Sequence, residues 1–242
     1  GVHDLAGFPG ETVTEGLDGL RQRLHEYAGL GARFAKWRAV INVDTATGLP
    51  TAGGIEANAH ALARYAALCQ EEGVVPIVEP EVLMDGSHDI AACEAATAAT
   101  LASVFAVLRA QRIVLEGIVL KPNMIVSGKD CPVQSEVDEV AQATIRVFRR
   151  LVPAAVPGIA FLSGGQSPQI ATAHLNAMNG LGPLPWELTF SYGRALQETT
   201  LQTWCGEETR VGAAQLEFLL RARLNSAARS GSYTEEMERT AA

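Results

Sequence analysis

Lysine is scarce in this chain, which has three lysines against sixteen arginines, and acidic residues outnumber basic ones. The formal net charge is −8 at pH 7. A surface that binds nucleic acid or an anionic membrane needs an excess of positive charge, so we expect neither partner. An anionic small molecule would need a local group of cations.

Cysteines are few and far apart, and no C-x-x-C pair or Cys/His spacing typical of zinc occurs. We therefore expect free thiols in a reducing compartment and neither a metal nor another cofactor. We find no signal-peptide pattern and expect no stretch that spans a bilayer, which favours a cytoplasmic protein. The cysteines are Cys69, Cys93, Cys131 and Cys205.

The signatures of two large enzyme classes are also missing. No G-x-G-x-x-G follows an apolar run, which argues against a dinucleotide-binding domain. No G-x-S-x-G occurs, so we do not expect Ser163 to be a nucleophile. The five histidines have no spacing typical of a metal site or a catalytic triad.

Apolar, β-branched runs alternate along the chain with alanine-rich amphipathic stretches, which predicts parallel β/α units. With 242 residues, 48% of them hydrophobic, we expect one domain over 1–242 that ends in a frayed tail at 230–242. The predicted strands are 33–41, 74–83, 113–125, 158–163 and 187–192. The predicted helices are 15–29, 57–72, 89–110, 135–151, 168–179 and 209–228.

Polar residues recur near the carboxyl ends of the predicted strands. Lys36, Glu79, Lys121 and Ser163 follow one another at intervals of 43, 42 and 42 residues, which is one β/α unit each, and Ser191 follows after 28. In a parallel barrel these ends converge on the face that carries the active site. An open doubly wound sheet also gathers strand ends, usually with a glycine fingerprint that this chain lacks.

Lys121 lies in a run that is apolar on both sides of the charge. A desolvated lysine can lose its proton and become a nucleophilic amine, whereas arginine stays protonated. We therefore expect covalent amine chemistry, typically a Schiff base with a carbonyl. The alternative is a lysine whose stem is buried and whose ammonium reaches water.

Two pairs of charged residues stand at i and i+2 on neighbouring predicted strands, so each pair shares one strand face. Glu79 and Glu81 could divide acid and base roles. Lys36 and Arg38 could bind an anion or, by charge repulsion, help Lys121 to lose its proton. The alternative for all four is a pair of structural salt bridges.

Two glycine-containing turns follow the last two predicted strands. Ser163, Gly164 and Gly165 precede a predicted helix, and Ser191, Gly193 and Arg194 follow the next strand. Backbone N–H groups at such a turn can bind phosphate, and arginine adds a forked donor. A simple turn with a helix cap is the alternative for the first site, but two consecutive turns favour phosphate.

These motifs resemble class I fructose-bisphosphate aldolase, and the resemblance covers essentially the whole chain. It implies a TIM (β/α)8 barrel, a homotetramer and the reversible cleavage of fructose 1,6-bisphosphate into dihydroxyacetone phosphate and glyceraldehyde 3-phosphate. The motifs are Phe34–Arg38, Val78–Leu83, Leu120–Met124, Phe161–Ser167 and Leu188–Leu196.

The resemblance also implies roles for single residues. Lys121 would be the Schiff-base lysine and Glu79 the acid/base that dehydrates the carbinolamine. Glu81, Lys36 and Arg38 would belong to the same pocket. The phosphate would be held by Ser163, Gly164, Gly165, Ser191, Gly193 and Arg194.

The chain matches only the part of the family that follows the third barrel strand. Five predicted strands stand where a closed barrel has eight. The aspartate that handles the cleavage proton, a further active-site lysine and the terminal tyrosine have no counterpart here. We expect a fragment, or a partner chain that supplies the rest. The alternatives are another Schiff-base lyase for a phosphorylated sugar, and a subunit that binds sugar phosphate or a protein without turnover.

Overall fold

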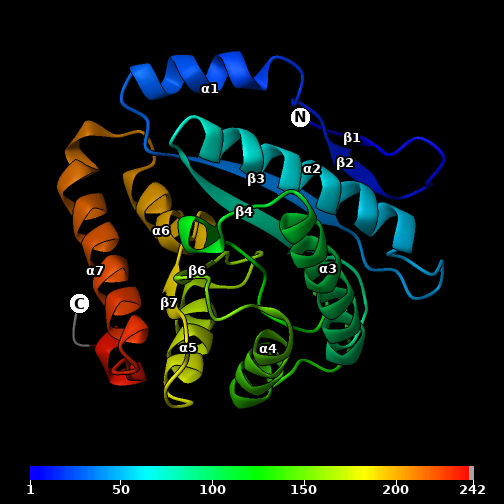
Figure 1. Ribbon diagram of the computed structural model, residues 1–242. Coiled ribbons are helices and arrows are strands. Elements are labelled where there is room, and N and C mark those ends of the chain that lie inside the picture. The colour runs from blue at the N-terminus through cyan, green and yellow to red at the C-terminus, as the bar shows by residue number, and fades with distance from the viewer. Residues whose placement is uncertain (240–242) are drawn as a thin grey trace.

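A five-stranded parallel sheet forms the centre of the computed structural model, which describes residues 1–239 (Figure 1). The strand order β3-β4-β5-β6-β7 follows the chain, as the alternation of apolar runs and amphipathic stretches predicts. The sheet ends at β3 on one side and at β7 on the other. The bounds are β3 Phe34–Ile41, β4 Val75–Val82, β5 Val119–Leu120, β6 Gly158–Phe161 and β7 Glu187–Phe190.

Helices follow the strands and pack against one another in an arc around the sheet (Figure 1). Neighbours in this arc are α2 with α3, α3 with α4, α4 with α5, and α5 with α7. Their apolar faces and the strands form one buried core. The bounds are α1 Leu20–Gly29, α2 Ala52–Glu71, α3 Ile90–Ala110, α4 Val137–Leu151, α5 Pro168–Asn179, α6 Arg194–Trp204 and α7 Val211–Arg229.

The predicted strand 113–125 is wrong over most of its length, because only Val119–Leu120 pair in the sheet. Residues Leu115–Gly117 form a 3-10 turn, and Pro122 has no N–H to continue a ladder. The side chain of Asn123 provides the acceptor for the end of β4 instead, because its Oδ1 accepts a hydrogen bond from the Val82 N–H at 3.1 Å. The apolar run is buried, but mostly as a loop.

Two elements were not predicted. Helix α6 is short and mostly polar, and it buries only Ala195. The other element is an antiparallel hairpin of β1 (Val2–Asp4) and β2 (Thr12–Thr14), which lies beside β3. The hydroxyls of Thr12 and Thr14 in this hairpin donate to the backbone carbonyls of Val40 and Arg38. The hairpin therefore provides hydrogen-bond donors for part of the edge of β3.

Helix α3 contradicts the expectation that no stretch of this chain is long and apolar enough to span a bilayer. The helix has 21 residues, and an 18-residue window within it has a mean hydropathy of 1.7, which meets that requirement by length and composition alone. The helix packs on α2, α4 and β4, which are the neighbours of a helix that covers a sheet. Burial in the core explains the same apolar composition.

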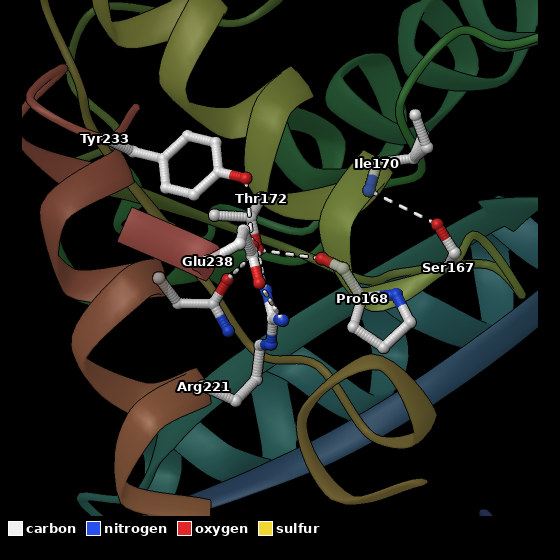
Figure 2. Close-up of polar contacts among 8 residues, drawn as sticks. Ser167, Pro168, Ile170, Thr172, Arg221, Tyr233 and Glu238 are labelled. Carbon is white, nitrogen blue, oxygen red and sulfur yellow. Dashed lines mark hydrogen bonds and ion pairs between the residues drawn. The ribbon is translucent and has the colours of Figure 1, made fainter. Parts of the chain in front are cut away.

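The prediction of a frayed tail at 230–242 is wrong for residues 230–239, and residues 240–242 lie outside the described part of the chain. Tyr233 is buried, and its backbone N–H donates to Asn176 Oδ1 at 2.9 Å. Glu238, in a 3-10 turn, receives the Tyr233 hydroxyl at 2.9 Å and two guanidinium nitrogens of Arg221 at 2.7 and 2.8 Å (Figure 2). Arg221 on α7 is only 7% exposed, so a buried cation holds the segment in place.

We expect Arg221→Met to lower the free energy of unfolding by about 3 kcal/mol, because removing one member of a buried ion pair leaves the other uncompensated. Urea denaturation measures the effect. Glu238→Gln and the double variant complete a double-mutant cycle, and the double variant should lose less than the two single losses added together. Strict additivity would contradict a contact between these two side chains.

Candidate active site

Three charged side chains from neighbouring strands meet at the carboxyl end of the sheet. Lys121 Nζ lies 3.1 Å from Glu79 Oε1, and Lys36 Nζ lies 2.7 Å from Glu79 Oε2. Glu79 is 3% exposed, and the side chains of Lys121 and Lys36 are 13% and 43% exposed. The buried carboxylate of Glu79 therefore forms ion pairs with two ammonium groups, and that of Lys121 belongs to a side chain that is almost buried.

The parallel register produces this arrangement. Arg38 is opposite Glu79, and residues two positions apart share a face, so Lys36, Arg38, Glu79 and Glu81 all project to the same side. Lys121 follows β5 directly, and its backbone N–H donates to Val78 O at 2.8 Å. The structure thus places the lysine next to Glu79 even though β5 is short.

The second cation–carboxylate pair joins Arg38 Nε to Glu81 Oε2. The hydrogen bond to Glu81 raises the pKa of the Arg38 guanidinium against the opposing effect of burial, and the nearby charges of Glu79 and Asp85 act in the same direction. Arg38 therefore stays protonated in this site. The salt-bridge alternative is correct for Lys36 with Glu79 and for Arg38 with Glu81. Glu79, however, also contacts Lys121, which follows a third strand.

The turn after β6 has the backbone of an anion-binding site. Gly164 and Gly165 have φ values of 61° and 93°, which only glycine adopts without strain. Within residues 1–239, neither glycine donates its N–H to another protein group. Leu162 N–H donates to Pro122 O at 3.2 Å, so this turn lies next to the segment that carries Lys121.

The second glycine turn meets the first. Ser191 follows β7 and donates its N–H to Phe161 O at 2.8 Å, and Gly193 precedes α6. Arg194 begins α6, and its NH2 nitrogen lies 3.3 Å from the place that a Cβ on Gly165 would occupy. The two turns that the sequence suggested separately therefore lie next to each other. Ser163, at the start of the first turn, is buried.

Helix α5 starts directly after the first turn, and its opening residues are held by side chains. Ser167 is the N-cap and accepts the Ile170 N–H at 3.3 Å. The hydroxyl of Thr172 donates to Pro168 O at 2.7 Å, and Arg221 donates to that hydroxyl at 3.3 Å (Figure 2). The buried cation that holds the C-terminal segment therefore also supports the helix that follows the turn after β6.

The buried side chain of His174, which the sequence gave no reason to select, supports the turn after β6 through Gln166. His174 Nδ1 lies 2.6 Å from Gln166 Oε1, and Gln166 Nε2 donates to Ser163 O at 2.9 Å. Burial lowers the pKa of His174 to about 4, so the ring is neutral near pH 7. A neutral ring can donate from Nδ1 to the Gln166 carbonyl oxygen.

The third lysine also lies at this turn, where sequence analysis assigned it no role. Lys129 Nζ forms an ion pair with Asp85 Oδ1 at 2.7 Å. Its rarity in a chain with three lysines was the only signal that could have selected it. Among residues 1–239, no three His, Cys, Asp or Glu side chains form a group that could hold a metal ion.

The parallel β/α units and the lysine, carboxylate and glycine turns at their ends are features of a barrel enzyme. A profile of the class-I fructose-bisphosphate aldolase family, described as glycolytic, matches residues 1–242. The chain is 56% identical to the probable fructose-bisphosphate aldolase class 1 of Xanthomonas axonopodis pv. citri over 234 residues, which cover 96% of this chain and 70% of that protein. This chain belongs to the class I fructose-bisphosphate aldolase family.

Other relatives give the same result. The chain is 52% identical to the fructose-bisphosphate aldolase of Dictyostelium discoideum, and the match covers 98% of this chain and 66% of that protein. A ternary complex of the fructose-bisphosphate aldolase of Plasmodium falciparum matches with a TM-score of 0.95 and 48% identity, over 97% of this chain and 67% of that one. The chain thus spans about two thirds of these relatives' length.

The predicted fold class is confirmed: this chain carries five β/α units of an aldolase TIM barrel. The predicted resemblance to the family is confirmed as well. The structure places the predicted site residues in two adjoining groups, one around Glu79 and one around Gly165.

We expect the free energy of unfolding to decrease as pH falls from about 6.5 to about 4. In this range His174 binds a proton in the unfolded chain, whereas burial keeps it neutral in the folded protein. This contribution is fully present above pH 6.5 and amounts to on the order of 3 kcal/mol. Urea midpoints measured across this pH range test it. His174→Asn, which keeps a polar atom near Nδ1, should show a shallower pH slope, and an unchanged slope would contradict the assignment.

Proposed function

We propose that this chain carries the Schiff-base site of a fructose 1,6-bisphosphate aldolase. In this reaction the sugar is cleaved reversibly to dihydroxyacetone phosphate and glyceraldehyde 3-phosphate. The observation that carries the proposal is the position of Lys121 Nζ, nearly buried and 3.1 Å from the buried carboxylate of Glu79. A lysine in such surroundings can exchange its proton with a neighbour and attack a carbonyl.

The proposed step is balanced within the site. Glu79 takes a proton from the Lys121 ammonium, and the free amine attacks the ketone carbon to form a new C–N bond. A proton moves from this nitrogen to the former carbonyl oxygen, which gives a neutral carbinolamine. Glu79 then returns its proton to that hydroxyl, the C–O bond breaks and water leaves. The products are a protonated imine on Lys121, one water and the original Glu79 carboxylate.

Lys36 and the second pair have supporting roles in this proposal. Lys36 Nζ lies 2.7 Å from Glu79 Oε2 and supplies the positive charge that holds the carboxylate while it exchanges protons. Arg38 and Glu81 neutralise each other beside it, so the pocket keeps a fixed arrangement of charges. Removing Lys36 would leave Glu79 with Lys121 alone.

The two glycine turns bind the substrate phosphate in this proposal. Within residues 1–239 the N–H groups of Gly164 and Gly165 have no protein acceptor, and the guanidinium of Arg194 lies next to Gly165. Ser163, Ser191 and Gly193 belong to the same two turns. Backbone donors and a forked cation are the usual partners of phosphate. No added cofactor is required by this chemistry.

A second function is binding of a sugar phosphate without turnover. The observation in its favour is that the two glycine turns and Arg194 adjoin each other and can bind a phosphate whether or not a Schiff base forms on Lys121. Covalent trapping together with a cleavage assay separates the two functions. Product release supports the aldolase, and a trapped adduct without product supports binding alone.

Location and assembly follow the family in this proposal. One relative, from Arabidopsis thaliana, is named a cytosolic aldolase, and it is 55% identical over 97% of this chain. We propose a cytoplasmic protein that forms a homotetramer. Sedimentation of the purified protein tests the oligomeric state.

We expect borohydride reduction in the presence of dihydroxyacetone phosphate to add the mass of the reduced adduct to the peptide that contains Lys121. Peptide mass spectrometry measures this. Lys121→Met should lose the label, because it keeps the size of the side chain without the amine. Label on Lys36 or Lys129 in the unaltered protein would show that the Schiff-base assignment is wrong.

We expect Arg194→Ala to weaken substrate binding more than it slows the chemical step, because its cation binds phosphate already in the ground state. A charge-assisted contact of this kind contributes about 1.5–3 kcal/mol, so KM, or Kd where no turnover occurs, should rise about tenfold or more. Arg149→Ala, an exposed arginine on α4, is the control. A fall in kcat at unchanged KM would argue against this role.

A further inference from the structure

We propose that Lys129 is a second cationic donor of the phosphate site, beside Arg194, and that Asp85 holds it there until phosphate binds. The inference rests on the proposed function, because it assigns one more residue to that phosphate site. Its basis is a convergence of side chains on Gly165. Lys129 Nζ and Arg194 NH2 each lie 3.3 Å from the position that a Cβ on Gly165 would take.

The backbone of Lys129 is fixed by a neighbouring loop. Gly128, Lys129 and Asp130 donate their N–H groups to the carbonyls of His88, Met84 and Gly86 at 2.8, 2.7 and 2.9 Å. These bonds join the loop after β5 to the loop after β4. A lysine on a supported backbone loses less conformational entropy when its ammonium binds a ligand.

The missing side chain of Gly165 creates the space for both cations. A Cβ there would also lie 3.1 Å from Lys129 Cε, which is closer than most real contacts. The two cationic groups therefore approach the same glycine from different loops, one after β5 and one at the start of α6. Two like charges so near each other repel unless an anion lies close to them.

Of the two cations near Gly165, only Lys129 is paired with Asp85. Their ion pair measures 2.7 Å, and the Asp85 side chain is 59% exposed. Arg194 forms no ion pair with any of the residues 1–239. An exposed ion pair is weak, so Lys129 can exchange the carboxylate for a phosphate oxygen at little cost.

The charges match a phosphate ester, which carries nearly two negative charges at pH 7. Lys129 and Arg194 together supply two positive charges, and the N–H groups of Gly164 and Gly165 supply neutral donors. With phosphate bound, both cations are compensated, whereas before binding only Lys129 is. The arrangement therefore favours a dianionic ligand over a singly charged one.

Calorimetric titration of the 242-residue chain with inorganic phosphate at pH 7.5 tests the proposal without requiring turnover. We expect Lys129→Met to raise Kd about five- to tenfold, since a charged hydrogen bond is lost but a weak ion pair with Asp85 no longer has to be broken. Lys129→Arg should bind within about twofold of the unaltered chain, because it keeps the charge. Asp85→Asn should lower Kd about two- to threefold, because Lys129 no longer has a competing carboxylate.

Two further variants separate this inference from the proposed function. Arg149→Met removes one positive charge on α4 and should leave Kd unchanged, so an equal effect of Arg149→Met and Lys129→Met would overturn a local role of Lys129. Arg194→Ala tests the phosphate site itself. If the unaltered chain binds no phosphate, or if Arg194→Ala does not weaken binding, the phosphate site is wrong and the role of Lys129 with it. If Arg194→Ala weakens binding and Lys129→Met does not, only the role of Lys129 is overturned.

Discussion

The buried carboxylate of Glu79 is the constraint on which the rest of the site depends. A charge that is 3% exposed is tolerated only when cations and hydrogen bonds compensate it. Lys36 on one neighbouring strand and Lys121 after the other provide that compensation at 2.7 and 3.1 Å. A slip of one residue in either strand pairing would point one lysine away from Glu79 and leave the carboxylate with the other lysine alone. The chemistry and the register of three strands therefore depend on the same contact.

The group around Glu79 was the part of the candidate site that the sequence predicted best. Polar residues at near-equal intervals, each at the end of an apolar run, are a local signal that parallel strands convert into a spatial one. Lys36, Glu79 and Lys121 lie together for this reason. The i, i+2 spacing of Glu79 and Glu81 likewise predicted a shared face, and the structure shows each of them paired with a different cation.

The errors have physical reasons as well. The apolar run 113–125 is buried, but burial alone does not distinguish a strand from a loop, and Pro122 and Asn123 divert the backbone from the ladder. Helix α6 is short and mostly polar and buries only Ala195, so its few apolar residues did not stand out in the sequence. The polar composition of residues 230–239 suggested disorder, because the partner that orders them, Arg221, is close only in the folded chain.

The contact between Arg221 and Glu238 also sets an order of events during protein synthesis. Lys36, Glu79 and Lys121 leave the ribosome long before Glu238, so the amine site can assemble while the chain is still growing. Helix α5, which follows the glycine turn after β6, obtains the support of Arg221 only after α7 has been made, and Arg221 pairs with Glu238 only when that residue has been added. A nascent chain that ends before residue 238 thus lacks the carboxylate that pairs with Arg221, and the helix after β6 gains its full support only when the last residues have been added.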